Sequence, residues 1–247
     1  MDLTRRYAGR TALITGAGSG IGAATARRLA AEGARVLVTD VDEAAARRVA
    51  AELPDAAAVR LDITDRASID RVFRELPALH VLVNNAFVPF ADDPDEHWRR
   101  QLDGTLLGAV HCSRAALPHL AAGAGAVVTV GSVNAEADFG DHAYSAAKAA
   151  LGSFTRTLAG EAAALGVRVN QVNPGTVATP AWAGKETGLA ALAARAYPLG
   201  RVGTPDDIAA AVAFLGSADA GWITGTTLRV DGGLLAVNRH FREILGD

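Results

Sequence analysis

The sequence predicts an α/β fold in which one doubly wound parallel sheet of about seven strands carries helices on both faces. Short apolar runs alternate with longer helical patterns along all 247 residues, and 50% of the residues are hydrophobic. Strands this apolar, each separated from the next by a helix, are typical of a parallel sheet that is covered on both faces. No internal repeat, low-complexity linker or change of composition marks a boundary, so residues 1–247 are expected to form a single domain.

Each expected element has its own local signal. The strands are short runs rich in Val, Leu and Ala, bounded by polar residues or by Gly and Pro, and the helices are longer stretches rich in Ala, Arg and Leu. Right-handed crossovers would join the strands into a doubly wound sheet. In chain order the expected strands are 11–14, 35–38, 58–61, 81–83, 126–130, 167–170 and 227–230. The clearest helices are 21–31, 44–53, 94–120 and 141–165.

One segment, 176–200, departs from this alternation. It holds Pro180, Gly184, Gly188 and Pro198 around an Ala-rich piece and follows the carboxyl end of a strand. In open α/β sheets, ligands bind beyond the carboxyl ends of the strands. The segment is therefore expected to be a lid over the substrate.

The bulk properties favour a cytoplasmic protein. The formal net charge is −3 and no basic stripe is present, which argues against binding to nucleic acid or to an anionic membrane. The single cysteine, Cys112, cannot form an internal disulfide, in keeping with a reducing compartment. No apolar segment follows the charged N-terminus as in a signal peptide, and no apolar run is long enough to span a bilayer.

A glycine-rich turn lies between the first strand and the first helix, at 15–22. Glycine allows a sharp backbone turn and the close approach of a pyrophosphate to the helix N-terminus, where unpaired N–H groups favour negative charge. The same composition also occurs in turns with a purely structural role, so the context of strand and helix is what favours nucleotide binding. The residues expected to contact the nucleotide are Gly16, Ser19, Gly20, Ile21 and Gly22.

The identity of the nucleotide depends on Asp40, which ends the second strand. An acid at this distance from the turn accepts hydrogen bonds from the adenosine ribose, and its charge repels a 2′-phosphate, so NAD is expected and NADP is less favoured. The alternative for Asp40 is an acidic turn residue on the surface. Asp62 and Ile63 follow the third strand and are expected beside the adenine, although Asp62 is as well suited to cap a helix.

Tyr144 and Lys148 lie four residues apart in a stretch without Pro or Gly, so a helix would place both side chains on one face. A free tyrosine titrates at about pH 10, and a nearby cation lowers that pKa towards the range of a general base. This spacing also occurs by chance. It gains weight here because Lys148 is one of only two lysines in the chain.

Taken together, these motifs resemble the short-chain dehydrogenase/reductase superfamily. The resemblance extends from about Gly9 to Gly233 and implies a single Rossmann domain and usually a homotetramer. In chain order the motifs are Thr15-Gly-Ala-Gly-Ser-Gly-Ile-Gly22, Asn84-Asn85-Ala86, Ser132, Tyr144-Ser-Ala-Ala-Lys148 and Asn173-Pro174-Gly175.

The resemblance assigns roles to single positions. Tyr144 is the implied acid/base, Lys148 holds the nicotinamide ribose and lowers the pKa of the tyrosine, and Ser132 hydrogen-bonds the substrate oxygen. Ser132 also suits a strand-end cap, and the Asn84–Asn85 pair suits a tight turn. The implied cofactor contacts beyond the glycine-rich turn are Asn85, Ala86, Pro174, Gly175, Val177 and Thr179.

Two positions depart from the family pattern. Thr105 stands where many relatives have a fourth catalytic residue, an Asn that props open a helix kink while its backbone carbonyl holds a relay water. Thr105 keeps a carbonyl and has a hydroxyl that can bond back to a helix carbonyl, so activity is expected to survive. Phe87 stands where Gly usually follows the Asn-Asn-Ala motif and is expected to reshape the cofactor edge.

The expected activity is an NAD-dependent transfer of a hydride between nicotinamide and a secondary alcohol or ketone. Two alternatives remain open: an NADPH-dependent 3-ketoacyl or carbonyl reductase, and a non-catalytic NAD-binding sensor or scaffold. No metal site is expected, because no His, Cys or carboxylate pair has the spacing of metal ligands. The helices 94–120 and 141–165 suit a two-fold interface in a homotetramer or homodimer. The expected substrate contacts are Ser132, Asn134, His142 and Trp182.

Overall fold

The computed structural model describes residues 5–76 and 78–237. Seven strands form one sheet in the order β3-β2-β1-β4-β5-β6-β7, and every neighbouring pair is parallel. The predicted fold class is therefore confirmed. The strands are β1 Thr11–Ile14, β2 Arg35–Asp40, β3 Ala56–Arg60, β4 Val81–Asn84, β5 Ala126–Val130, β6 Arg168–Pro174 and β7 Thr227–Val230.

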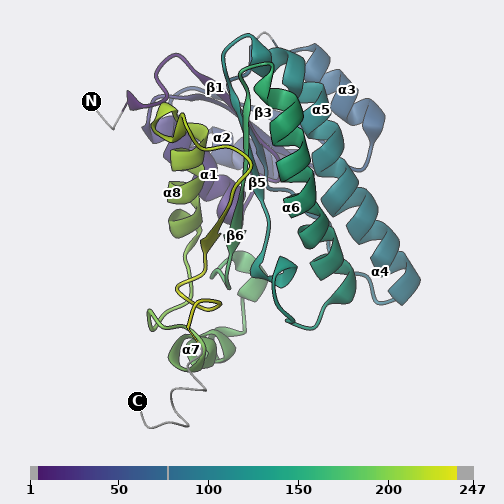
Figure 1. Ribbon diagram of the computed structural model, residues 1–247, viewed down its shortest axis with the longest axis vertical. Coiled ribbons are helices and arrows are strands. Elements are labelled where there is room, and N and C mark those ends of the chain that lie inside the picture. The colour runs from purple at the N-terminus through teal and green to yellow at the C-terminus, as the bar shows by residue number, and fades with distance from the viewer. Residues whose placement is uncertain (1–4, 77, 238–247) are drawn as a thin grey trace.

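Helices cover both faces of the sheet (Figure 1). One face carries α1 Gly20–Ala31, α2 Glu43–Ala50 and α8 Pro205–Gly216, and the other carries α3 Arg66–Arg74, α5 Gly108–Ala121 and α6 His142–Ala163. Two apolar clusters fill the spaces between these layers. Alternate residues of β1 supply both, since Ala12 and Ile14 belong to the cluster under α1 and Leu13 belongs to the cluster under α5.

One crossover differs from the others. The connection from β5 to β6 passes through α6, whereas the connection from β6 to β7 passes through α8 on the opposite face, where α8 packs against α1. Both connections move the chain in the same direction across the sheet, so they have opposite hands. The expectation of right-handed crossovers throughout is thus wrong for the β6–α8–β7 unit.

The helix expected over 94–120 is interrupted. It begins as α4 Pro94–Arg100, continues as a π-helix, η2 Gln101–Leu107, and ends as α5. π-helical turns inside α-helices occur often at functional sites. The backbone of η2 approaches its surroundings closely, because a Cβ added to Gly104 would lie 2.2 Å from Val88 Cγ1.

The segment 176–200 lies beyond the carboxyl ends of the strands, at the bottom of Figure 1. It contains a short helix, η4 Pro180–Trp182, and α7 Glu186–Arg195, whose residues are mostly exposed. Two further short helices, η3 Val133–Ala135 and η5 Ala218–Ala220, follow β5 and α8. No helix in the described ranges is both long and apolar enough to cross a membrane.

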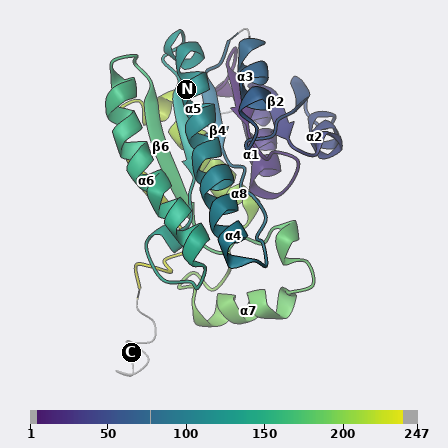
Figure 2. The same ribbon diagram turned by 90° about the vertical axis from the view of Figure 1, so that its right-hand side faces the viewer.

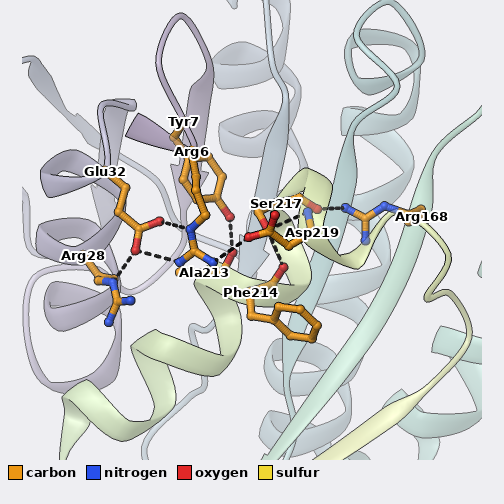
Figure 3. A network of polar contacts seen from close by, with 9 residues as sticks. All are labelled: Arg6, Tyr7, Arg28, Glu32, Arg168, Ala213, Phe214, Ser217 and Asp219. Carbon is orange, nitrogen blue, oxygen red and sulfur yellow. Dashed lines mark hydrogen bonds and ion pairs between the residues drawn. The ribbon is translucent and has the colours of Figure 1, made fainter. Parts of the chain in front are cut away.

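A polar network closes the opposite end of the sheet (Figure 3). Arg6 donates from Nε and Nη2 to the two carboxylate oxygens of Glu32, both at 2.7 Å, and from Nη1 to Asp219 at 3.1 Å. Tyr7 is buried and its hydroxyl donates to the Ala213 carbonyl oxygen at 2.5 Å. The network comprises Arg6, Tyr7, Arg28, Glu32, Arg168, Ala213, Phe214, Ser217 and Asp219.

Candidate active site

Tyr144 and Lys148 lie one turn apart at the start of α6, as their spacing predicts. Asp141 caps this helix, and its side chain accepts a hydrogen bond from the Tyr144 backbone N–H at 2.8 Å. Lys148 Nζ lies 5.5 Å from the centroid of the Tyr144 ring and donates to the Val130 carbonyl oxygen at 2.7 Å. The helix thus directs the phenol and the ammonium to the carboxyl end of β5.

Lys148 is only 3% exposed. Burial lowers the pKa of Lys148 to about 7, because the charged form loses its hydration. No ion pair to this ammonium is found among the described residues. A buried cation without a carboxylate partner is costly to maintain, which favours a functional role for it.

Burial also raises the pKa of the Tyr144 phenol, the hydrogen bond with Ser132 opposes that rise, and the charge of Asp141 adds to it. The sequence instead predicted that Lys148 would lower the pKa of Tyr144. The difference arises because desolvation is larger than the other effects in the protein alone. A cofactor ribose and a substrate oxygen would add hydrogen bonds that these atoms do not have here.

Ser132 caps the short helix η3 and lies beside Tyr144. Its Oγ caps η3 by accepting from the Asn134 N–H at 3.2 Å, and it donates to Asn134 Oδ1 at 3.0 Å. The same residue reaches the Tyr144 hydroxyl. Asn173 holds the Ser132 backbone through a hydrogen bond of 3.2 Å from the Ser132 N–H. The structure thus brings Ser132, Asn134, Tyr144 and Lys148 together.

The glycine-rich turn has no room for side chains. A Cβ at Gly16 would lie 2.8 Å from Ala86 Cα, and a Cβ at Gly22 would lie 2.3 Å from the Gly16 carbonyl oxygen. Gly16 and Gly20 have φ values of +63° and +54°, which L side chains rarely adopt. Backbone N–H groups therefore remain accessible at this turn, as a pyrophosphate requires.

The N-terminus of α1 lacks the cap that most other helices have. Side chains of Asp42, Asp65, Asp93, Asp141 and Thr204 cap α2, α3, α4, α6 and α8. Ser19 at the same position of α1 makes no side-chain cap bond, and no acidic residue lies in the first turn. Unpaired N–H groups and the positive end of the helix dipole are thus left for an anion, which fits the phosphates of a dinucleotide.

A cavity of about 420 Å³ lies against this helix start. It extends from the glycine-rich turn to the beginnings of η4 and α8. Its lining residues are Gly18, Ser19, Gly20, Ala23, Ala24, Arg27, Pro180, Pro205 and Asp206.

Asp40 ends β2 beside the glycine-rich turn. Its Oδ2 accepts from the Gly18 N–H at 2.9 Å, and its Oδ1 accepts from the Asp42 N–H at 3.0 Å. A Cβ at Gly18 would lie 2.9 Å from the same carboxylate. The carboxylate is therefore fixed next to the turn and keeps lone pairs for further donors, as contact with a ribose requires.

Thr15, to which the sequence assigned no role of its own, connects Asn85 and Ala86 to the glycine-rich turn. The Thr15 hydroxyl accepts from the N–H groups of both, each at 3.0 Å. Asn85 Nδ2 in turn donates to the carbonyl oxygens of Thr15 and Gly16, at 3.0 and 2.9 Å. Thr15 belongs to the motif quoted above, but only the structure shows that it joins the β1 and β4 ends.

The cap interpretation of Asp62 is wrong. The cap of α3 is Asp65, whereas Asp62 accepts hydrogen bonds from the backbone and hydroxyl of Thr64, at 2.9 and 2.7 Å. Ile63 is buried, and its carbonyl oxygen would lie 2.9 Å from a Cβ added to Gly108.

The predicted nicotinamide contacts begin where β6 ends. Pro174 is the last residue of β6, and the N–H of the following Gly175 donates to the Val230 carbonyl oxygen at 3.1 Å. Val177 is buried and forms a bridge with Gly203. Thr179 comes back to the glycine-rich turn, because a Cβ added to Gly20 would lie 3.4 Å from its Cγ2.

Thr105 lies within the π-helix and is buried. Its hydroxyl donates to Gln101 Oε1 at 2.9 Å, and Gln101 Nε2 donates to the Val88 carbonyl oxygen at 3.2 Å. The hydroxyl was expected to bond back to a helix carbonyl, and this expectation is wrong, since the buried Gln101 side chain is its acceptor. The interruption of the helix thus persists with Thr at this position.

The other expected contacts lie further out. His142 is exposed in the first turn of α6, and Trp182 ends η4 with the Lys185 Nζ 5.7 Å from its ring centroid. Phe87 is 52% exposed on the segment after β4. Sequence reasoning missed Phe90, which packs edge-on against Tyr144. The apolar run after Asn-Asn-Ala was its one signal.

No group of three or more His, Cys, Asp or Glu side chains suited to a metal ion occurs in 5–76 or 78–237. The side chains that the structure gathers at this site are a phenol, an ammonium and a hydroxyl.

Comparisons with known proteins find relatives that match nearly the whole chain. The family profile that matches residues 16–235 is described as enoyl-(acyl carrier protein) reductase. A cis-4-hydroxycyclohexanecarboxylate dehydrogenase from Sinomonas cyclohexanicum is 43% identical over 246 residues, which cover 94% of this chain and 98% of the relative.

Two solved structures superpose closely on this chain. An oxidoreductase of the short chain dehydrogenase/reductase family from Burkholderia thailandensis has a TM-score of 0.89 and 41% identity, over 96% of this chain and 98% of its own. A protein from Brucella melitensis 16M, named as a ribose-5-phosphate isomerase, has a TM-score of 0.90 and 36% identity over 98% of both chains.

Proposed function

The chain belongs to the short-chain dehydrogenase/reductase family, and we propose that it is an NAD-dependent oxidoreductase that transfers a hydride between nicotinamide and a secondary alcohol or ketone. The observation that carries the proposal is the placement of the Tyr144 phenol next to both Ser132 and the buried Lys148. The name of the Sinomonas relative, a dehydrogenase of a cyclic hydroxy acid, supports an alcohol as the substrate.

The residues divide the chemistry among them. Bound NAD supplies the hydride acceptor in oxidation and the donor in reduction. Ser132 Oγ holds the substrate oxygen, and Tyr144 removes the hydroxyl proton of an alcohol or returns it to a ketone. Lys148 Nζ favours the phenolate, because protonation of Lys148 and deprotonation of Tyr144 stabilise each other.

The preference for NAD follows from Asp40. A 2′-phosphate in contact with the adenosine ribose would face this fixed carboxylate, whereas the two ribose hydroxyls of NAD can donate to it. Titration calorimetry of NADH and NADPH into the purified protein measures the preference. If NADPH binds more tightly than NADH, the NAD-dependent activity is contradicted and an NADPH-dependent carbonyl or 3-ketoacyl reductase is favoured.

The substitution Tyr144→Phe tests the proposed role of the phenol. It should lower kcat for alcohol oxidation by a factor of about 10²–10⁴ while NADH binds with unchanged affinity. Tyr7→Phe is a control, because it removes a hydrogen-bonded phenol hydroxyl at the other end of the sheet. Full activity of Tyr144→Phe would exclude the mechanism, and retained NADH binding without any turnover in the wild type would favour an NAD-binding sensor.

We further propose that 176–200 acts as the lid of a single domain. This segment leaves β6 next to the expected nicotinamide position, carries α7 outside the sheet, and returns through Tyr197, whose hydroxyl accepts from the Thr176 N–H at 2.5 Å. NADH should therefore slow proteolytic cleavage within 176–200. Cleavage at an unchanged rate in the presence of saturating NADH would exclude closure over the cofactor.

An oligomer built on α4, α5 and α6 is also proposed. Trp98, Leu102 and Leu107 are exposed along α4 and η2, and Leu165 is exposed after α6. Exposed apolar side chains along neighbouring helices suit a two-fold contact with a second copy. Light scattering should give a mass of two or four chains, and a monomer at micromolar concentration would contradict the proposal.

A further inference from the structure

Phe90 lies beside the reacting phenol and the chain covers it only in part. Its ring contacts the Tyr144 ring edge-on, with centroids 5.9 Å apart and an interplanar angle of 88°. Phe90 is nevertheless 60% exposed. An aromatic ring in this setting has an apolar surface that the core does not use.

The backbone on both sides of Phe90 is held by buried or half-buried polar groups. On one side, Gln101 Nε2 donates to the Val88 carbonyl oxygen at 3.2 Å, and Gly104 packs against the Val88 side chain. On the other side, the Ala91 N–H donates to His97 Nδ1 at 3.4 Å. These bonds fix the position from which the ring projects.

His97, which holds the Ala91 backbone, is also connected to Tyr144 through Asp141. Because His97 Nδ1 accepts a hydrogen bond, the proton of the neutral ring is on Nε2, which lies 3.0 and 3.1 Å from the two Asp141 carboxylate oxygens. Asp141 Oδ1 also accepts from the Tyr144 N–H at 2.8 Å. One carboxylate thereby orients the start of α6 and, through His97, the segment that bears Phe90. Figure 2 shows α4, which carries His97, beside the lower end of α6.

His97 and Phe90 also contact each other directly. Their ring centroids are 5.5 Å apart at an interplanar angle of 75°, so the imidazole supports one side of the Phe90 ring. Tyr144, Phe90, His97 and Asp141 form a closed circuit of contacts, in which Phe90 touches the Tyr144 ring and Asp141 accepts from the Tyr144 backbone N–H.

We propose that Phe90 is a specificity-determining residue that selects secondary alcohols with a ring or a branched hydrocarbon on the carbinol carbon. The inference rests on the proposed function, since it places the carbinol between Ser132 and Tyr144. The hydrocarbon then lies against the exposed surface of Phe90, where it leaves water. His97 and Asp141 are positioning residues, which act through Phe90 and Tyr144 and do not contact the substrate.

The experiment compares cyclohexanol with propan-2-ol as substrates with NAD⁺. Loss of about 50–100 Å² of apolar contact in Phe90→Ala should lower kcat/KM for cyclohexanol about ten- to fiftyfold. The value for propan-2-ol should change less than about threefold, because that substrate is too small to reach much of the ring. The matched control is Trp222→Ala, which removes a fully exposed aromatic side chain before β7, the edge strand of the sheet. Equal losses for both alcohols in Phe90→Ala, or no loss, would overturn the proposal.

The positioning role of His97 is tested by combining His97→Ala with Phe90→Ala and comparing the ratio of kcat/KM for cyclohexanol to that for propan-2-ol. His97→Ala should lower the ratio of the two kcat/KM values in the same direction as Phe90→Ala. The double variant should lower it no further than Phe90→Ala alone, since His97 acts on this ratio only through Phe90. Additive effects would show that His97 supports the fold or the substrate in another way.

A binding measurement separates this proposal from the proposed function. Saturation-transfer NMR of cyclohexanol with the NADH-bound protein requires no turnover. If the wild type oxidises neither alcohol, the hydride-transfer proposal is contradicted. If the cyclohexanol signal is nevertheless present with the wild type and lost with Phe90→Ala, the apolar contact is supported. Equal signals in the wild type and Phe90→Ala overturn the role of Phe90 whatever the activity.

Discussion

The two ends of the sheet treat buried charge in opposite ways. At the amino ends of the strands, Arg6 is paired with both Glu32 and Asp219, and Arg28 also contacts Glu32 (Figure 3). At the carboxyl ends, Lys148 is buried with a backbone carbonyl as its acceptor. The first arrangement stabilises the folded chain, whereas the second carries a cost that binding of a ligand can offset.

The pKa shifts follow the same division. The hydrogen bond to Glu32 raises the pKa of Arg6. Burial alone would raise the pKa of Glu32, but the hydrogen bonds from Arg6 and Arg28 lower it. Burial lowers the pKa of Lys148 to about 7, and no carboxylate among the described residues pairs with it to oppose this shift. A paired charge is thus held more firmly ionised by folding, and an unpaired one less so.

Two tyrosines extend the comparison, since Tyr7 is fully buried and Tyr144 is half-buried. Burial raises the pKa of both Tyr7 and Tyr144. The Tyr7 hydroxyl donates to the Ala213 carbonyl oxygen, whereas the Tyr144 hydroxyl lies beside the Ser132 side chain. The two phenols therefore differ in their hydrogen-bonding neighbours, and in the proposed function it is these neighbours that make Tyr144 the acid/base.

The largest expected effect on activity is that of replacing Lys148, the unpaired charge at the carboxyl ends of the strands. Lys148→Met should lower kcat by at least about a hundredfold, because the cation that favours the phenolate is lost. The cofactor-free variant should nevertheless be more stable than the wild type at pH 6, since a buried charge is removed. Steady-state kinetics and urea unfolding check the two halves, and a variant less stable than the wild type would contradict the assignment of Lys148 as a cost.

The pH dependence of stability, compared between the wild type and Lys148→Met, tests independently whether the Lys148 charge destabilises the folded chain. Because folding lowers the pKa of Lys148 to about 7, the unfolded chain holds the extra proton between about pH 7 and 10. Stability of the cofactor-free wild type should rise in this window by up to about 1.4 kcal/mol per pH unit relative to Lys148→Met, and the difference should level off below pH 7. Parallel pH profiles would show that the ammonium is not desolvated.

Removing an ion-pair partner of Arg6, at the amino ends of the strands, should lower stability without affecting activity. Glu32→Ala leaves the buried Arg6 guanidinium with Asp219 alone, and a buried ion pair that loses one partner costs about 3 kcal/mol. The urea midpoint should fall accordingly, while kcat/KM stays within about twofold, as for surface changes remote from a site. A comparable loss of kcat/KM in the folded protein would mean that the two ends are coupled.

Asp40 is the anionic counterpart of Lys148, fixed by backbone N–H groups at the cofactor end of the sheet. Asp40→Ala should weaken NADH binding by about tenfold, the value of one or two hydrogen bonds to a charged group, and improve NADPH relative to NADH. Calorimetric titration with both nucleotides measures this. An unchanged NADH affinity would remove the carboxylate from the cofactor site.

The smallest effect is expected at Tyr7. Tyr7→Phe removes the hydrogen bond to Ala213 and leaves that carbonyl without this donor, which should cost about 1 kcal/mol of unfolding free energy. Activity should be unchanged. A loss of activity like that of Tyr144→Phe would show that burial of a phenol, and not its neighbours, is what matters.

Local patterns in the sequence were enough to predict the succession of strands and helices along the chain, the glycine-rich turn, Asp40 at the end of β2 and the shared helix face of Tyr144 and Lys148. All of these depend on residues close together along the chain, where the periods of strand and helix and the conformational freedom of glycine are decisive. The tertiary structure alone decided the opposite hand of the β6–α8–β7 crossover, the π-helix around Thr105, and the contacts that join Phe90, His97 and Asp141 to Tyr144. It also decided the low pKa of Lys148. Desolvation and contacts between segments tens of residues apart depend on how complete layers pack, and no local pattern records that packing.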